Sequence, residues 1–211
     1  MAFNAYLVFH SKVRGDDFNQ GIFGESTSKP EPGWGRGAIE ITEYGFGVSM
    51  PVTSSRSDGG GATVGRAAFD HFTCNKNIDT ATPWLVRYCC LGQNIPSIVL
   101  HIFRSGGTVA TQVQGVEEGA DSGAVKYAMV VFQNCVITKV GISGSGDELP
   151  KEQLEFNYGL CEYTYQYTSH LTGKTMSAVQ PIRFCWSTVT NQELTTGQDF
   201  NKFEPRNPVE V

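Results

Sequence analysis

Basic clusters and long apolar runs are both missing from this chain. Its 16 lysines and arginines stand against 21 aspartates and glutamates, and they are scattered rather than grouped. With a formal net charge of -5, the chain offers no basic patch for nucleic-acid phosphates or anionic lipids. Its longest apolar stretches, such as residues 127–132, are far shorter than the roughly 20 residues of a membrane helix. We therefore expect a soluble protein with no nucleic-acid partner and no membrane insertion.

Marks of export through a signal peptide are also lacking. Residues 1–9 have no basic start, and their apolar run is too short for a signal peptide. No Asn-x-Ser/Thr glycosylation acceptor occurs. We interpret the cysteines as reduced, mostly buried thiols of a cytoplasmic protein that needs no disulfide to fold. They are Cys74, Cys89, Cys90, Cys135, Cys161 and Cys185.

What the chain does have is short segments of alternating apolar and polar residues, separated by clusters of Gly, Ser, Asn and Asp. This pattern is typical of half-buried antiparallel strands. The predicted strands are residues 3–10, 37–50, 64–72, 97–104, 125–142, 152–167 and 180–189. One helix is predicted, with Thr82 as its N-cap, Pro83 at its first position and Gly92 at its C-terminal end.

In two predicted strands the apolar residues switch from one set of alternate positions to the other, a change of parity. The switches lie between Ile41 and Tyr44 and between Leu160 and Tyr163. A parity change moves side chains to the opposite face unless a bulge or bend absorbs an extra residue. Closing a sheet into a barrel requires such bends. The pattern therefore favours a mainly β, barrel-like protein.

The length of 211 residues suits one domain, which we place at residues 1–191. Residues 11–36 lack periodicity and are interpreted as a surface insertion, with Phe18, Ile22, Phe23 and Trp34 as possible anchors. Residues 50–63 form a second long loop, and residues 192–211 a polar C-terminal tail.

Two segments resemble a phosphate-binding or catalytic motif but lack residues that the motif requires. Residues 60–65 have the Gly-x4-Gly spacing of a phosphate-binding loop, but Arg66 and Ala67 stand where Lys and Ser or Thr are needed. Residues 141–146 resemble a nucleophile elbow around Ser143, yet Ser145 replaces the required glycine, so a hairpin loop is the better interpretation.

The remaining candidates are interpreted as structural. The histidines are isolated, and the adjacent pair Cys89-Cys90 lacks the spacing of a metal knuckle. We expect the acidic pairs to be solvated and the tyrosines near residue 160 to line the barrel wall instead of forming a stacking platform. These residues are His10, His71, His101, His170, Asp147, Glu148, Glu152, Glu155, Tyr158, Tyr163, Tyr165 and Tyr167. No catalytic, metal or cofactor site is predicted, and the protein is not expected to be an enzyme.

Several segments share an order and spacing typical of one family. They are residues 44–49 (YGFGVS), 59–61 (GGG), 69–79, 80–85 (TATPWL), 98–104 (IVLHIFR), 127–142, 144–150 (GSGDELP), 156–159 (FNYG), 184–186 (FCW) and 190–191. Together they resemble the Hcp (hemolysin-coregulated protein) family of type VI secretion. The resemblance covers roughly residues 1–10 and 37–191. Residues 11–36 and the C-terminal tail are longer than in typical members.

The resemblance implies a closed β-barrel of two antiparallel sheets with one flanking α-helix. It implies a tube protein that forms stacked homohexameric rings, is expelled by a contractile sheath and carries effectors in its lumen. Sheath, baseplate and spike components would be its partners. It would reside in the bacterial cytoplasm before assembly and then be secreted without a signal peptide.

Two other functions fit the same sequence, a tail-tube protein of a phage-like contractile device and a monomeric β-barrel ligand-binding module. In the tube interpretation, the loop at residues 51–62 is an arm that contacts other subunits, because it is longer than a hairpin needs and its glycines allow close packing. Its predicted interface residues are Pro51, Ser54, Ser55, Asp58, Gly59, Gly60 and Gly61.

Overall fold

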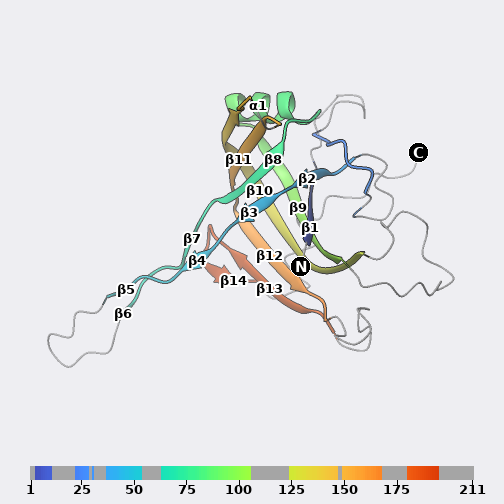
Figure 1. The fold of residues 1–211 in the computed structure, drawn as a ribbon. Helices are drawn as coiled ribbons and strands as arrows, with labels where there is room; N and C mark the ends of the chain where they lie inside the picture. The colour runs from blue at the N-terminus through green and yellow to red at the C-terminus, as the bar shows by residue number, and fades with distance from the viewer. Residues whose placement is uncertain are drawn as a thin grey trace, which may run out of the picture.

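Most strands belong to one antiparallel sheet that is rolled around a core, as Figure 1 shows. The computed structural model describes residues 3–10, 22–28, 30, 37–53, 63–105, 124–146, 149–167 and 180–194. The ten strands of the large sheet are β1 (Phe3–His10), β2 (Ile39–Ile41), β3 (Glu43–Gly45), β8 (Phe72–Asn77), β9 (Asn94–Ser105), β10 (Ala124–Ser143), β11 (Lys151–Asn157), β12 (Leu160–Tyr165), β13 (Ile182–Ser187) and β14 (Gln192–Glu193). Two short ribbons pair β4 (Val48–Ser49) with β7 (Ala68–Phe69) and β5 (Val52–Thr53) with β6 (Thr63–Val64).

Strand β10 organises the sheet because it is long enough to pair with three others. On one side it pairs with β9, and on the other with β12 over its first part and β11 over its second. Strand β1 lies beyond β9, and β8 lies beyond β11. All of these pairs are antiparallel, as the alternating sequence pattern predicted.

The predicted closed barrel of two antiparallel sheets is not what the strand pairing shows. Strand β2 pairs with β1, and β3 pairs with β8, but no ladder between two separate strands closes the described sheet. The chain itself passes from one end to the other at Thr42, whose N–H donates to the Asn75 carbonyl at 2.9 Å. Strands β12, β13 and β14 branch off β10 and leave the roll open on that side. The mainly β character and the helix are confirmed.

Two bends are present, and one of them lies where the sequence predicted it. The first separates β2 from β3 at Thr42, as predicted. The second separates β11 from β12 at Tyr158 and Gly159, before the predicted position, and β12 runs in unbroken register from Leu160 to Tyr165. Opposite the second bend, Asn134 adopts a positive φ of 54°, a conformation that asparagine tolerates better than most residues. Gly159 N–H donates to the Gln133 carbonyl there at 2.9 Å, so the bend keeps a bond to β10.

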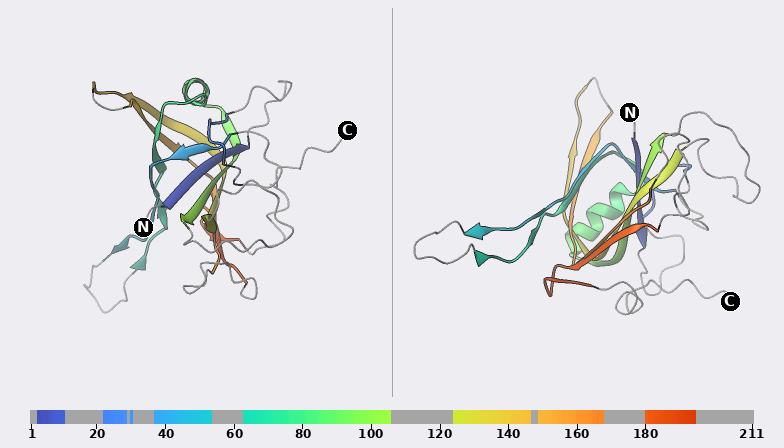
Figure 2. Two further views of the ribbon diagram at one scale, coloured as in Figure 1. Left: turned by 45° about the vertical axis from the view of Figure 1, so that its right-hand side comes forward. Right: turned by 90° about the horizontal axis from the view of Figure 1, so that it is seen from below.

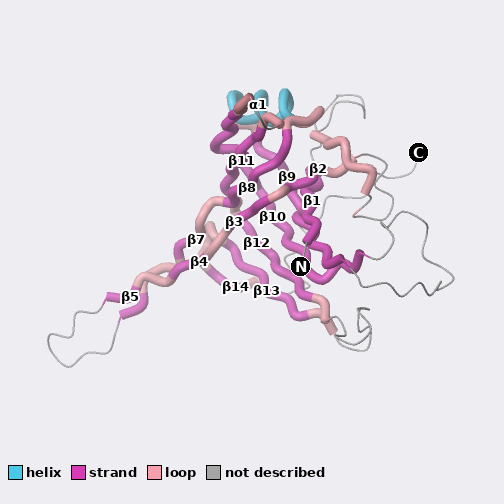
Figure 3. Tube along the Cα trace, in the orientation of Figure 1, coloured by secondary structure: helices cyan, strands magenta, loops and turns pink. Residues whose placement is uncertain are grey.

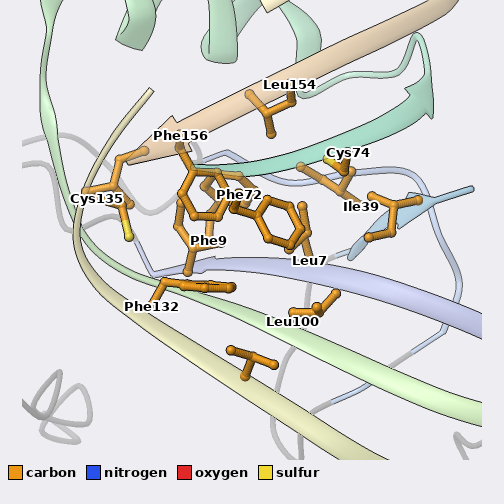
Figure 4. Close-up of a cluster of buried hydrophobic side chains, with 14 of the residues drawn as sticks. Leu7, Phe9, Ile39, Phe72, Cys74, Leu100, Phe132, Cys135, Leu154 and Phe156 are labelled. Carbon is orange, nitrogen blue, oxygen red and sulfur yellow. The ribbon is translucent and has the colours of Figure 1, made fainter. Parts of the chain in front are cut away.

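The core lies inside the roll and is centred on three phenylalanines (Figure 4). Phe72, Phe132 and Phe156 are fully buried, and their ring centroids lie 4.7 to 5.3 Å apart. Aromatic pairs at such separations add attraction to the effect of burial. These rings come from β8, β10 and β11, so the core fastens together strands that are distant in sequence.

Helix α1 (Thr82–Leu91) lies across one end of the roll, near β8, β10 and β11 (Figure 3). Pro83 stands in its first turn, and Gly92 ends it with a left-handed φ of 58°, as predicted. The predicted N-cap is wrong: Ala81 precedes the helix, and the Ala81 N–H donates to the Asp79 carboxylate at 3.0 Å. No described helix is long and apolar enough to cross a membrane.

A buried ionic network holds α1 on the sheet. The Lys76 ammonium lies 2.8 Å from Glu152 Oε2 and 2.7 Å from Asp79 Oδ1, and both the Lys76 and Glu152 side chains are fully buried. The Thr82 hydroxyl donates to Glu152 Oε2 at 2.5 Å. The prediction that Glu152 is solvated is therefore wrong, because β11 turns this residue inward.

Part of the segment predicted as a surface insertion belongs to the body of the protein. Ile22 is buried in the main core at 2% exposure. A Cβ at Gly24 would lie 2.4 Å from the Ala38 carbonyl oxygen, so the backbones are in close contact there. Ser28 donates a hydrogen bond to the Tyr6 hydroxyl at 3.0 Å. Residues 11–21, 29 and 31–36 of this segment, with the predicted anchors Phe18 and Trp34, lie outside the described part of the chain.

The predicted tail begins later than residue 192. Gln192 and Glu193 form β14 against β13, and the Leu194 N–H donates to the Cys185 carbonyl at 3.0 Å. Residues 192–194 are therefore held against β13. Residues 195–211 are not described.

All six cysteines are free, and four of them are buried. Burial raises the pKa of Cys74 and Cys161 to about 12, which keeps them as unreactive thiols. Cys161 pairs with Trp186, the neighbour of Cys185, so the Cys161 and Cys185 side chains lie on opposite faces of the sheet. We expect the melting temperature to be the same with and without reductant. A large drop on reduction would contradict this prediction.

Candidate assembly site

The two short ribbons form a projecting arm, defined here as residues 47–53 and 63–70. Figures 1 and 2 show it extending away from the rolled sheet in every view. Val48 pairs with Phe69 at its base, and Val52 pairs with Val64 further out. The segment predicted as a loop over residues 50–63 therefore carries a strand at each end.

Of the interface residues predicted from the sequence, Pro51 lies in the arm and is exposed. Ser54, Ser55, Asp58, Gly59, Gly60 and Gly61 lie outside the described residues. Their role in an interface stays a prediction.

One face of the arm carries an apolar stripe that the sequence interpretation missed. Val48, Met50 and Val52 are exposed at 58%, 47% and 56%. Alternate positions of an extended strand share one face, so these three side chains form a row. The alternation is visible in the sequence, but the interpretation of residues 50–63 as a loop concealed it. Exposed apolar rows on a projecting element are typical of protein–protein contacts.

The stripe continues onto the body through aromatic contacts. Phe69 lies opposite Val48 and stacks on Trp186 with a centroid distance of 6.3 Å. Trp186 in turn stacks on Phe184 at 6.1 Å. Phe184 and Ile182 stand at alternate positions of β13 and are exposed at 41% and 55%. The three-residue stripe of the arm is therefore extended on the body by Phe69, Trp186, Phe184 and Ile182.

The same region has an open strand edge. Strand β12 pairs with β13 along its length, whereas β14 pairs with only Trp186 and Ser187. Within the described residues, Ile182 to Phe184 have no strand on their outer side. Unpaired backbone groups beside exposed apolar side chains favour pairing with another chain.

The tyrosines do not form a row of free rings for a ligand. Tyr158 is 4% exposed and donates to the Asp70 carbonyl at 3.1 Å, and burial raises its pKa. Tyr163 and Tyr165 are half-buried and pack against the main core. Tyr167 is more open, at 41% exposure. The interpretation of these tyrosines as wall residues agrees with the structure for the first three.

The histidines are dispersed in space. His71 lies at the surface with Nδ1 2.6 Å from Glu155 Oε1, and this hydrogen bond lowers the pKa of Glu155. His101 is buried in β9, His10 ends β1, and His170 lies outside the described residues. The structure brings together no group of three metal-ligating side chains in the part that it describes.

The other sequence motifs are ordinary structural features. Gly141 to Ser143 are the last residues of β10 and pair with β11, so only Gly144 to Gly146 belong to the predicted hairpin loop. Cys89 is half-buried and Cys90 exposed on α1. Asp147 and Glu148 lie outside the described residues.

The described residues combine a rolled antiparallel sheet, one helix, a projecting arm with an exposed apolar stripe and an open strand edge. Residues 13–165 match the family model described as "Type VI secretion system effector, Hcp". The chain therefore belongs to the Hcp family of type VI secretion, which confirms the resemblance seen in the sequence.

Solved structures agree at the level of fold. A structure described as a type six secretion system protein is 21% identical, with a TM-score of 0.69, over 92% of this chain and all of that one. Hcp1 from Salmonella typhimurium is 19% identical over 92% of this chain and all of that one, with a TM-score of 0.61. A variant of Hcp1 from the E. coli EAEC 042 pathovar is 19% identical, with a TM-score of 0.56, over 88% of this chain and all of that one. No curated protein matches the chain.

Proposed function

We propose that this protein is a structural subunit of the type VI secretion tube and assembles into homohexameric rings that stack. The observation that carries this proposal is the family match over residues 13–165. The protein acts through assembly in this proposal, and it is not an enzyme.

The arm and the open edge of β13 supply a physical basis for ring formation. The arm extends away from the body, so its apolar stripe is available to a neighbouring copy (Figure 2). A contact between two different surfaces of identical subunits is head-to-tail, and it closes into a ring when its rotation allows. In this arrangement the arm tip at residues 54–62, with its triple glycine, reaches a neighbouring subunit or ring.

The remaining partners follow from family membership. Sheath, baseplate and spike components would contact the tube, and effectors would travel in its lumen. The protein would be made in the bacterial cytoplasm and leave through the secretion apparatus without a signal peptide. No nucleic acid, cofactor or metal takes part in this proposal.

Light scattering after size exclusion tests the ring directly. The expected mass is that of six copies of the 23.0 kDa chain, about 138 kDa. Negative-stain electron microscopy should show rings in the same fraction. A monomeric mass across a wide concentration range would overturn the proposal and favour the ligand-binding module instead.

A further inference from the structure

Between the two ribbons of the arm, one strand has one residue more than the strand that it faces. Ser49 pairs with Ala68 and Val52 with Val64, so two residues, Met50 and Pro51, face the three residues 65–67. One extra residue on one side of an antiparallel pair is a β-bulge, which bends the strand and redirects a side chain. Arg66 is the middle residue of this bulged stretch.

The Arg66 side chain crosses from the arm to the body. Its Nη2 donates to the carbonyl oxygen of Thr188 at 2.7 Å and to that of Val189 at 2.8 Å. Nη2 carries two hydrogens, so each carbonyl can accept one. Both acceptors belong to the turn between β13 and β14, more than 120 residues away in sequence.

The acceptor turn is itself held in place. The Thr188 N–H donates to the Gly159 carbonyl at 3.0 Å, and the Thr188 hydroxyl donates to the Tyr158 carbonyl at 2.9 Å. Asn191 completes the turn with a positive φ of 56°. Arg66 therefore attaches the arm to a fixed point where the sheet bends between β11 and β12.

From this geometry we infer that Arg66 is a positioning residue that sets the direction of the arm before assembly. The inference rests on the proposed function, in which the arm contacts another copy of this chain. The inference also gives a role to Arg66 itself, which stands where a phosphate-binding loop would need a lysine.

The arm needs such a contact because its two short ribbons have little stability of their own. Each ribbon of the arm has only two pairs of residues in register, and an isolated two-stranded ribbon is marginally stable in water. Holding the arm in its bound direction lowers the entropy lost when a neighbour binds. The Phe69–Trp186 stack remains at the base, so loss of Arg66 should loosen the arm without unfolding the body.

The test compares Arg66→Ala with two other variants. Arg66→Lys keeps the charge and one donor group, and Arg87→Ala removes an equal charge from α1, where Arg87 lies over the Trp84 ring at 5.3 Å. The first readout is amide hydrogen exchange of residues 47–53 and 63–70, at a concentration where every variant is monomeric. The second is the concentration for half-assembly, measured by mass photometry and sedimentation.

We expect Arg66→Ala to exchange faster in the arm and to leave β9 and β10 unchanged. Its half-assembly concentration should rise about three- to tenfold, because exposed hydrogen bonds to a charged group are at the weaker end of their range. Arg66→Lys should fall between Arg66→Ala and the parent, and Arg87→Ala should match the parent.

Unchanged exchange in the arm of Arg66→Ala would overturn the inference, whatever happens to assembly. Faster exchange with parental assembly would also overturn it, because the arm's direction would then not matter. If the parent itself never assembles, the proposed function fails, while the exchange experiment still decides whether Arg66 holds the arm.

Discussion

Replacing Lys76 by Met is expected to lower the free energy of unfolding by about 3–5 kcal/mol, because it leaves a buried charge without its partner. The Lys76 ammonium has three donors, and they reach Glu152 Oε2, Asp79 Oδ1 and the Asn77 carbonyl within 2.9 Å. Among the described residues, Glu152 Oε1 has no hydrogen-bond partner. Without Lys76, the Glu152 carboxylate keeps only the Thr82 hydroxyl. Urea denaturation followed by circular dichroism measures the loss.

The matched control removes both fully buried charges and leaves Asp79, whose side chain is partly exposed and still accepts from the Ala81 N–H. The double variant Lys76→Met with Glu152→Leu fills the same space with apolar groups, and such replacements are often neutral or stabilising. We expect it to be clearly more stable than Lys76→Met alone. If the single variant stays within about 0.5 kcal/mol of the parent, the range of ordinary surface substitutions, the network does not hold α1 as we infer.

Changing the arm's stripe is expected to weaken assembly about a hundredfold while leaving the subunit's melting temperature unchanged. The variant combines Val48→Thr, Met50→Thr and Val52→Thr, which keep β-propensity but remove apolar surface. Each side chain is about half exposed in the subunit, so the folded body loses little. If a neighbour buries them, each loses about 1 kcal/mol, and 3 kcal/mol together is about a hundredfold in affinity. Sedimentation velocity over a concentration series gives the affinity.

The control for the stripe variant removes apolar surface elsewhere. Val86→Thr with Leu91→Gln changes two exposed residues of α1, at 37% and 62% exposure, and should assemble as the parent does. Parental assembly of the stripe variant would show that the arm does not contact a neighbour through this face. A lower melting temperature would show instead that the stripe supports the subunit's own fold.

Strands with regular alternation could be predicted closely from the sequence. Residues 3–10 were predicted as a strand and form β1 over the same range, and residues 125–142 correspond to β10. The first parity change located the bend at Thr42, whereas the second bend, at Gly159, precedes the change predicted between Leu160 and Tyr163. These features are local, because the alternation of side chains across a strand depends on neighbours two residues apart.

Strand β8 shows where such reasoning fails. The prediction ended a strand at residue 72, whereas β8 runs from Phe72 to Asn77. Its inward positions are Phe72, Cys74 and Lys76, and a buried lysine breaks the apolar pattern. The signal was hidden because the partner that makes this burial possible, Glu152, lies on another strand far along the chain. The same separation explains why Glu152 was expected to be solvated.

By itself, the sequence determined the mainly β class, the helix with its Pro83 and Gly92, and membership of the Hcp family. Only the tertiary structure decided how the sheet rolls without a closing ladder, that Ile22 belongs to the core, and that Arg66 joins the arm to the β13–β14 turn. The first group depends on periodicity and short-range backbone preferences, which a reader can follow along the chain. The second depends on contacts between residues distant in sequence, and these exist only once the strands have paired and packed.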